Sequence, residues 1–163
     1  FYIILYYVNR VSSLIEKHMK ITYKCDYAIK TVLDLALHYN ELSTIHQIAR
    51  RIDAPVKFLE QVLLDLKRGG FVESKRGKIG GYQLAREPVL IKLGEVIRFI
   101  SGPIEPIACV EKDYSGCRET LNCVLRPVWG NVAQAISGII DNINFEELAA
   151  RVKDRKEVFT YSI

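Results

Sequence analysis

The residues of this chain best suited to chemistry are three cysteines, Cys109, Cys117 and Cys123, which fall within fifteen positions. One further cysteine, Cys25, occurs in the 163 residues, and we recognise no secretory signal. This usage is unlike a disulfide-stapled secreted domain and fits a metal-binding or redox-active thiol cluster. A tetrahedral zinc ion or an iron-sulfur cluster takes four ligands, so a fourth donor must come from elsewhere in the fold or from a second subunit.

The segments before the cysteines show helical periodicity. Apolar residues recur at helical spacing in residues 26–40, and a shorter helical pattern at residues 44–51 follows Ser43 as its N-cap. Pro55 takes a favoured first position of a third helix. Because a tight turn at residues 52–54 joins the second and third patterns, the sequence predicts a helix-turn-helix.

Two strands separated by a basic turn follow this helix-turn-helix. We predict strands at residues 71–75 and 81–85, with Arg76, Gly77 and Lys78 in the turn between them. Glycine permits the backbone angles of a tight turn, so the neighbouring cations are displayed at its tip. The hairpin is either the wing of a winged helix or a plain surface hairpin with solvated cations, and its position directly after a helix-turn-helix favours the wing.

Charge and composition point to a folded protein with a local positive surface. Hydrophobic residues make up 49% of the chain, enough for a packed core, and the net charge is +4. Between residues 67 and 87 cations outnumber carboxylates: Lys67, Arg68, Lys75, Arg76, Lys78 and Arg86 against Glu73 and Glu87. We expect a nucleic acid to bind there.

The region around the cysteines completes the predicted fold. A helix is expected at residues 90–101, and a long apolar stripe runs from Val124 to Ile140. The long helix is either a core helix of a monomer or, as we favour, a two-fold dimer helix, because operators with two half-sites match dimeric readers. The predicted fold class is mainly α with a small β-hairpin wing: a winged helix-turn-helix plus a long C-terminal dimerisation helix.

These elements divide the chain into four parts. We set residues 1–18 apart as an N-terminal extension before a native start at Met19, with an extra dimer-packing helix as the alternative. The DNA-binding domain then spans residues 19–101, the cysteine loop residues 102–123, and the dimerisation helix with a C-terminal tail residues 124–163. The apolar run at the start is far shorter than the about 20 residues that span a bilayer, so we expect a cytoplasmic protein without membrane association.

Residues dispersed from Met19 to about Ala150 resemble the Rrf2 family of bacterial winged-helix transcription regulators. The matching residues are Met19-Lys20-Ile21-Thr22, Asp26-Tyr27-Ala28, Ile48-Ala49, Phe58-Leu59-Glu60-Gln61, Arg76-Gly77, Gly80-Gly81-Tyr82 and Leu93-Gly94-Glu95-Val96-Ile97, followed by the cysteines, Trp129 and the long helix. Because they occur in order over most of the chain, they are more specific than any single motif.

This resemblance implies a homodimer that binds a pseudo-palindromic operator in double-stranded DNA, with the recognition helix in the major groove and the wing in the minor groove. The residues implied at the DNA are Lys57, Phe58, Glu60 and Gln61 of the recognition helix, and Arg76 and Lys78 of the wing. Glutamine can pair with adenine, glutamate can accept from cytosine, and lysine can reach guanine or phosphate. Arginine at the wing tip suits a narrow minor groove. Lys57 replaces the small polar residue found in some relatives, so the operator sequence is not carried over.

The resemblance also implies that the three cysteines hold an iron-sulfur cluster, [2Fe-2S] or [4Fe-4S], as in the branch of the family that senses redox state, nitric oxide or cluster supply. Such clusters are easily lost in air. Seven residues separate Cys109 from Cys117, where related sensors often have five. The five residues between Cys117 and Cys123 agree with those sensors.

The resemblance restricts the fourth ligand. In cluster-assembly relatives a histidine lies three residues after the last cysteine, but Arg126 occupies that position, and a guanidinium does not normally ligate iron. In nitric-oxide-sensing relatives an aspartate near the N-terminus reaches across the dimer, and Asp26 is in the matching place. We therefore expect Asp26 of the partner subunit as the fourth ligand, with the adjacent Cys25 as the alternative.

Two other hypotheses keep the DNA-binding fold. The cysteines bind zinc or form a reversible thiol switch, or a partner enzyme controls DNA binding, as in relatives that lack the cysteines. An enzymatic function is not predicted, because the sequence has no phosphate-binding loop, dinucleotide fingerprint or nucleophile elbow.

Overall fold

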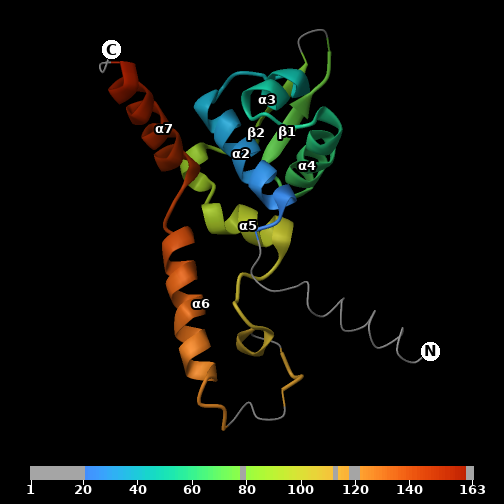
Figure 1. The fold of residues 1–163 in the computed structure, drawn as a ribbon. Helices are drawn as coiled ribbons and strands as arrows, with labels where there is room; N and C mark the ends of the chain where they lie inside the picture. The colour runs from blue at the N-terminus through green and yellow to red at the C-terminus, as the bar shows by residue number, and fades with distance from the viewer. Residues whose placement is uncertain (1–20, 78–79, 112–113, 118–121, 161–163) are drawn as a thin grey trace, which may run out of the picture. The chain divides into compact units, whose positions relative to one another are not determined.

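The computed structural model describes residues 21–77, 80–111, 114–117 and 122–160 (Figure 1). They fall into two compact units, one made of residues 21–102 and 138–160 and the other of residues in the range 103–137. The expectations for residues 1–18, Met19 and Lys78 concern positions outside the described residues.

The elements follow one another in the order of a winged helix with a helical C-terminal region. They are α2 (Tyr23–Leu37), α3 (Ile45–Arg51), α4 (Val56–Arg68), β1 (Val72–Lys75), β2 (Gly81–Leu84), the 3₁₀ turn η1 (Pro88–Leu90), α5 (Leu93–Ser101), the 3₁₀ turn η2 (Ala108–Val110), α6 (Arg126–Ile140) and α7 (Phe145–Thr160). Predicted and observed boundaries differ by a few residues.

Helix α2 is the centre of the first unit, which we call the winged-helix unit. It packs against α4, α5, α7 and β2 (Figure 1). The stripe predicted from the sequence supplies the buried side chains Val32 and Leu35 from α2, while α4 contributes Leu59, Val62 and Leu63. All five are at most 1% exposed, so these apolar stripes are buried in the core.

The helix-turn-helix consists of α3 and α4. Thr44, not Ser43 as predicted, caps α3: its hydroxyl accepts from the Gln47 backbone N–H while the Gln47 side chain accepts from the Thr44 N–H. Ser43 instead pairs its backbone with Tyr82 of β2, with N···O distances of 3.0 and 2.8 Å. The prediction was wrong because a strand contact far away in the sequence competes for the backbone of Ser43.

The wing is a two-stranded antiparallel sheet in which Val72 pairs with Leu84 and Lys75 with Gly81. The backbone of Gly81 lies against that of Ser43, which joins the wing to the start of α3. A Cβ atom at position 81 would lie 2.8 Å from the carbonyl oxygen of Ser43. Only glycine allows this approach without moving one backbone away from the other.

Replacing Gly81 with alanine should therefore lower the free energy of unfolding by about 1–3 kcal/mol, the usual cost of overpacking. Urea unfolding of the two proteins measures the difference. Gly130→Ala in α6 is the matched control, because a Cβ at that position meets no atom within 4 Å beyond its chain neighbours and the backbone of its own helix. An equal loss in both variants would show that the close approach to Ser43 does not matter.

The C-terminal region contains a helix, α7, where the sequence interpretation had only a tail. Asn144 caps it, accepting from the Glu147 N–H at 2.9 Å and donating to the Glu147 carboxylate at 2.6 Å. Phe145, fully buried, anchors the helix in the core, and its N–H donates to the Ile91 carbonyl at 3.1 Å. Residues 138–160 thus belong to the winged-helix unit.

The second unit contains the cysteine-bearing segment, η2 and most of α6. In α6 the side chains of Val128 and Trp129 are 54% and 37% exposed, although both are large and apolar. No described residue of α6 is classed as buried. A long helix with an exposed apolar surface is what the dimer-helix prediction requires.

Candidate nucleic-acid interface and cysteine loop

The start of α4 presents all four of its predicted DNA-binding side chains at the surface. Lys57, Phe58, Glu60 and Gln61 are exposed, since the stripe beginning with Leu59 faces the core. Phe58 also contacts α2, because its ring meets that of Tyr27 edge-on with 5.4 Å between centroids. Phe58 is thus a packing residue as well as a candidate contact, while the three polar candidates are exposed at the N-terminal part of α4.

The wing and the recognition helix are connected by side chains. Lys67 near the end of α4 donates to the hydroxyl of Ser74 in β1 at 2.7 Å. Arg76 follows β1 and is exposed, next to Gly77 with a φ of 128°. The positive φ explains why glycine occurs at this turn. Helix α4 and strand β1 are therefore joined by a side-chain hydrogen bond, and Lys57 and Arg76 are both exposed.

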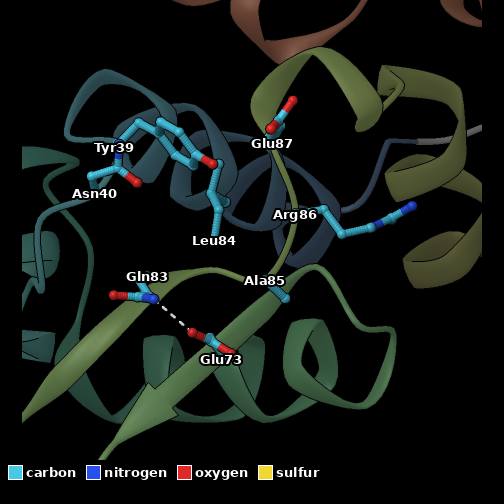
Figure 2. Close-up of a pocket in the computed structure, with 8 residues that line it drawn as sticks. All are labelled: Tyr39, Asn40, Glu73, Gln83, Leu84, Ala85, Arg86 and Glu87. Atoms are coloured by element: carbon cyan, nitrogen blue, oxygen red, sulfur yellow. Dashed lines mark hydrogen bonds between the residues drawn. The ribbon is translucent and has the colours of Figure 1, made fainter.

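A pocket of about 340 Å³ lies beside the base of the wing (Figure 2). It is lined by Tyr39, Asn40, Glu73, Gln83, Leu84, Ala85, Arg86 and Glu87. Within it Gln83 donates to Glu73 across the two strands at 2.6 Å, and the Arg86 side chain points away from the other lining residues. Arg86 belongs to the basic stretch of residues 67–87, but none of the recognition-helix, wing-tip or metal-ligand candidates lines this pocket.

The cysteine loop has its three sulfur donors at partly exposed positions, all as thiols without a disulfide. Cys109 lies in η2, and its carbonyl oxygen accepts from Nε of Arg126 at 3.0 Å. Arg126, which rules out the nearby-histidine ligand, therefore ties the start of α6 to the loop. Among the described residues no three His, Cys, Asp or Glu side chains are gathered as a ready metal site.

The two candidates for the fourth ligand occupy different environments at the start of α2. Cys25 is 0% exposed, whereas Asp26 is partly exposed and pairs with Lys30 at 2.7 Å. Burial raises the pKa of the Cys25 thiol; a hydrogen bond with Ser101 opposes this rise, and the charge of Asp26 adds to it. Of the two, Asp26 has the accessible donor.

Thiol alkylation should reproduce this difference in exposure. With iodoacetamide and native, cluster-free protein we expect three alkylated cysteines, Cys109, Cys117 and Cys123. Cys25 should react only on unfolding, because it is buried and its raised pKa keeps it protonated, while the thiolate is the nucleophile. Mass spectrometry of peptides reports each site, and Cys25→Ser should leave the native count at three. Alkylation of Cys25 as fast as Cys109 would contradict the prediction.

Membrane-spanning elements are absent from the part of the chain that the structure describes, since none of its helices is both long and apolar enough to cross a bilayer.

The fold and the exposed residues define a winged-helix protein that displays a recognition helix and a wing on one unit and carries clustered cysteines on the other. Residues 21–151 match the family model of Rrf2, described as an iron-dependent transcriptional regulator, and the chain belongs to this family. A similar protein is the rrf2-like HTH-type transcriptional regulator of Rhodobacter capsulatus, which is 36% identical over 138 residues, 80% of this chain and 92% of that protein.

Two solved structures are similar to this chain. CymR, the global cysteine regulator of Bacillus subtilis, has a TM-score of 0.67 and 29% identity over 81% of this chain and 97% of CymR. IscR of T. potens has a TM-score of 0.63 and 32% identity over 85% of this chain and 90% of IscR. The predicted mainly helical winged-helix fold and the membership of the Rrf2 family are confirmed, and the relatives support regulation through DNA binding.

Proposed function

We propose that this protein is a cytoplasmic, homodimeric transcriptional regulator whose affinity for a specific operator is modulated by an iron-sulfur cluster. Cys109, Cys117 and Cys123 would hold the cluster together with Asp26 of the partner subunit. The observation that carries the proposal is the combination of three partly exposed thiols in one segment with a partly exposed carboxylate at the start of α2. The description of the family as iron-dependent agrees with it.

Operator binding would use the exposed surface of α4 and the wing. Gln61 and Glu60 carry the donor and acceptor groups that distinguish adenine and cytosine in the major groove. Lys57 and Arg76 bring positive charge to the phosphates or, for Arg76, to a narrow minor groove. We include Phe58 as an apolar contact and Lys78 as a second cation of the wing.

A second copy of the chain would cover the apolar surface of α6. Val128, Trp129 and Ile139 are 54%, 37% and 63% exposed in the protomer, and burying such side chains is favourable by about 1.5–3 kcal/mol each when complete. Two copies related by a two-fold axis would place two recognition helices on two half-sites, in keeping with a palindromic operator.

The donor set fits an iron-sulfur cluster in its chemistry. Three thiolates are the soft ligands that such clusters take, and a carboxylate is a harder and weaker fourth partner. When bound, the cluster supplies a centre that reacts with oxidants and nitric oxide. The protein's part is to connect the loop of one protomer to α2 of the other, and Arg126 holds the Cys109 end of the loop through the backbone. Loading requires the loop to gather its three thiols.

Operator titrations with and without the cluster test the proposal. The operator is selected from random DNA, and the protein is prepared anaerobically and then stripped of its metal. Any regulation must equal the difference in operator affinity between the two forms, so equal affinities would exclude the sensing function while leaving a DNA-binding protein. Visible absorption with iron, sulfide and zinc analysis separates a cluster from zinc or a thiol switch, and co-purification of an enzyme would favour the third hypothesis.

Replacing Asp26 with alanine should shorten the lifetime of the cluster in air by about tenfold, because loss of a ligand costs at least as much as loss of a supporting group around a metal. The decay of visible absorption after exposure to air measures the lifetime. Glu95→Ala is the control, since the Glu95 side chain is about as exposed as that of Asp26, 43% against 45%, and is also in an ion pair, with Arg86 at 2.8 Å. An unchanged lifetime in Asp26→Ala would remove Asp26 from the ligand set.

A further inference from the structure

A buried carboxylate lies directly beneath the base-reading surface of α4. Asp65 is only 3% exposed, yet it carries charge, and burying a carboxylate is unfavourable unless it is paired and hydrogen-bonded. Its partners come from two helices. Lys24 of α2 places Nζ 2.5 Å from Oδ2, and Arg68 of α4 pairs with Oδ1. The carboxylate charge is therefore offset by one cation from each of the two helices.

The third partner of Asp65 is the candidate base-reading residue Gln61. Its Nε2 donates to Oδ1 of Asp65 at 3.3 Å, one helical turn along α4. An ionised carboxylate can only accept hydrogen bonds, so the amide nitrogen of Gln61 must face Asp65. This orientation leaves Oε1 and the second N–H of Nε2 for other partners. An acceptor beside a donor is the pair that adenine requires in the major groove.

We propose that Asp65 is a positioning residue that sets the orientation of the Gln61 amide for base reading. The inference rests on the proposed role of Gln61 at the operator. Without Asp65 the Gln61 amide is free to rotate. The entropy cost of ordering it then weakens DNA binding. Because Lys24 lies in the first turn of α2, the same carboxylate also connects the start of α2 to the base-reading side chain. Nothing in the sequence pattern of α4 distinguishes Asp65 from a surface residue, except its spacing of four from Gln61.

The consequence for DNA binding is selective, which separates positioning from general stabilisation. With operators selected by the wild-type protein, Gln61→Ala identifies the base pair that Gln61 reads by a loss of discrimination of about tenfold, within the usual range for a good base contact. Asp65→Ala removes the acceptor and leaves its space empty, whereas Asp65→Leu removes the acceptor and fills the space. Both variants should lose most of the same discrimination. In the Gln61→Ala background neither substitution should reduce the discrimination further. Asp65→Asn keeps an oxygen acceptor and should therefore retain more discrimination than Asp65→Ala or Asp65→Leu.

Three outcomes of the DNA measurements would overturn the proposal, and they differ in which other conclusions they remove. If Gln61→Ala loses discrimination and the Asp65 variants keep it, Asp65 has no positioning role while the base contact stands. If Gln61→Ala itself leaves discrimination unchanged, the base-reading role fails and the positioning role fails with it. An equal loss of affinity for every operator, in both backgrounds, would show a purely structural role and likewise exclude positioning.

The contact can also be measured without DNA or cluster. In uniformly ¹⁵N-labelled, cluster-free full-length protein, the Gln61 side-chain amide is assigned by its absence in Gln61→Ala. We expect it to be ordered on the picosecond to nanosecond timescale in the wild type and in Asp65→Asn, and mobile in whichever of Asp65→Ala and Asp65→Leu remains folded. A mobile Gln61 amide in the wild type would overturn the proposal independently of the DNA measurements.

Discussion

Serine in place of Cys109, Cys117 or Cys123 should reduce the iron and sulfide content of anaerobically purified protein to background. Serine is nearly the same size as cysteine, but its hydroxyl stays protonated and is a hard oxygen donor, whereas clusters are held by soft thiolates. With two thiolates and a carboxylate left, the proposed ligand set no longer holds iron. Iron and sulfide analysis and the visible absorption spectrum measure the loss, which should be almost complete for each single variant.

The fourth cysteine provides the matched control for these three. Cys25→Ser changes the same atom at a position that is 0% exposed, so its cluster content should remain that of the wild type. A loop variant that retained iron and sulfide would remove that cysteine from the ligand set. Loss of the cluster in a folded Cys25→Ser protein would instead favour Cys25, the alternative fourth ligand, over Asp26. All four variants are then stripped of any metal, and their binding to a selected operator checks that the winged-helix unit remains intact.

The elements that the sequence predicted well are those whose stability depends on a local pattern of apolar residues. Leu59, Val62 and Leu63 recur at helical spacing, and all three are fully buried on the inner face of α4. The same pattern fixes which polar residues of α4 remain outside, so Glu60 and Gln61 could be assigned to the surface from spacing alone. Periodicity therefore identified which side of the helix is exposed, and the resemblance to the Rrf2 family supplied the expectation that this side binds DNA.

Helix α7 was missed although its signals are present. Asn144 and Glu147 form a cap at its start, and Phe145, Leu148 and Ala149 follow at helical spacing. The stripe is short and the remaining residues are mostly charged, so the segment has the composition of a solvated tail. The helix is stabilised by tertiary packing, because Phe145 enters a core built from residues far earlier in the chain.

Buried charges were also beyond the reach of the sequence. The residues that flank Asp34 and Asp65 in the sequence are a mixture of polar and apolar types. Exposed carboxylates have the same kind of sequence neighbours. The burial of Asp34 and Asp65 depends on Arg51 and Lys24, which come from other helices and are identified only once the helices are packed. The arrangement of the cysteine loop is harder still to predict, because the proposed site includes a metal centre and a ligand from a second subunit.

Replacing Asp34 with alanine should lower the free energy of unfolding by about 3 kcal/mol, the lower end of the cost of breaking a buried ion pair. Asp34 is 5% exposed and accepts two hydrogen bonds from Arg51, at 2.8 Å from Nε and 2.7 Å from Nη2. The same Nη2 donates to the Ser43 hydroxyl at 2.7 Å, so the pair joins α2 to the segment that enters α3. Urea unfolding of the cluster-free protein measures the change.

The size of this effect depends on burial and on the two parallel hydrogen bonds, and both can be checked by comparison. Glu95→Ala breaks a single exposed contact with Arg86 and should cost no more than about 1 kcal/mol, as surface pairs do. Arg51→Ala leaves the buried Asp34 carboxylate without its main partner and should cost at least as much as Asp34→Ala, because Arg51 is 29% exposed and can reach water when its own partner is removed. If Asp34→Ala were no more destabilising than Glu95→Ala, the pair would contribute nothing beyond a surface contact. The connection between α2 and the helix-turn-helix would then rest on apolar packing alone.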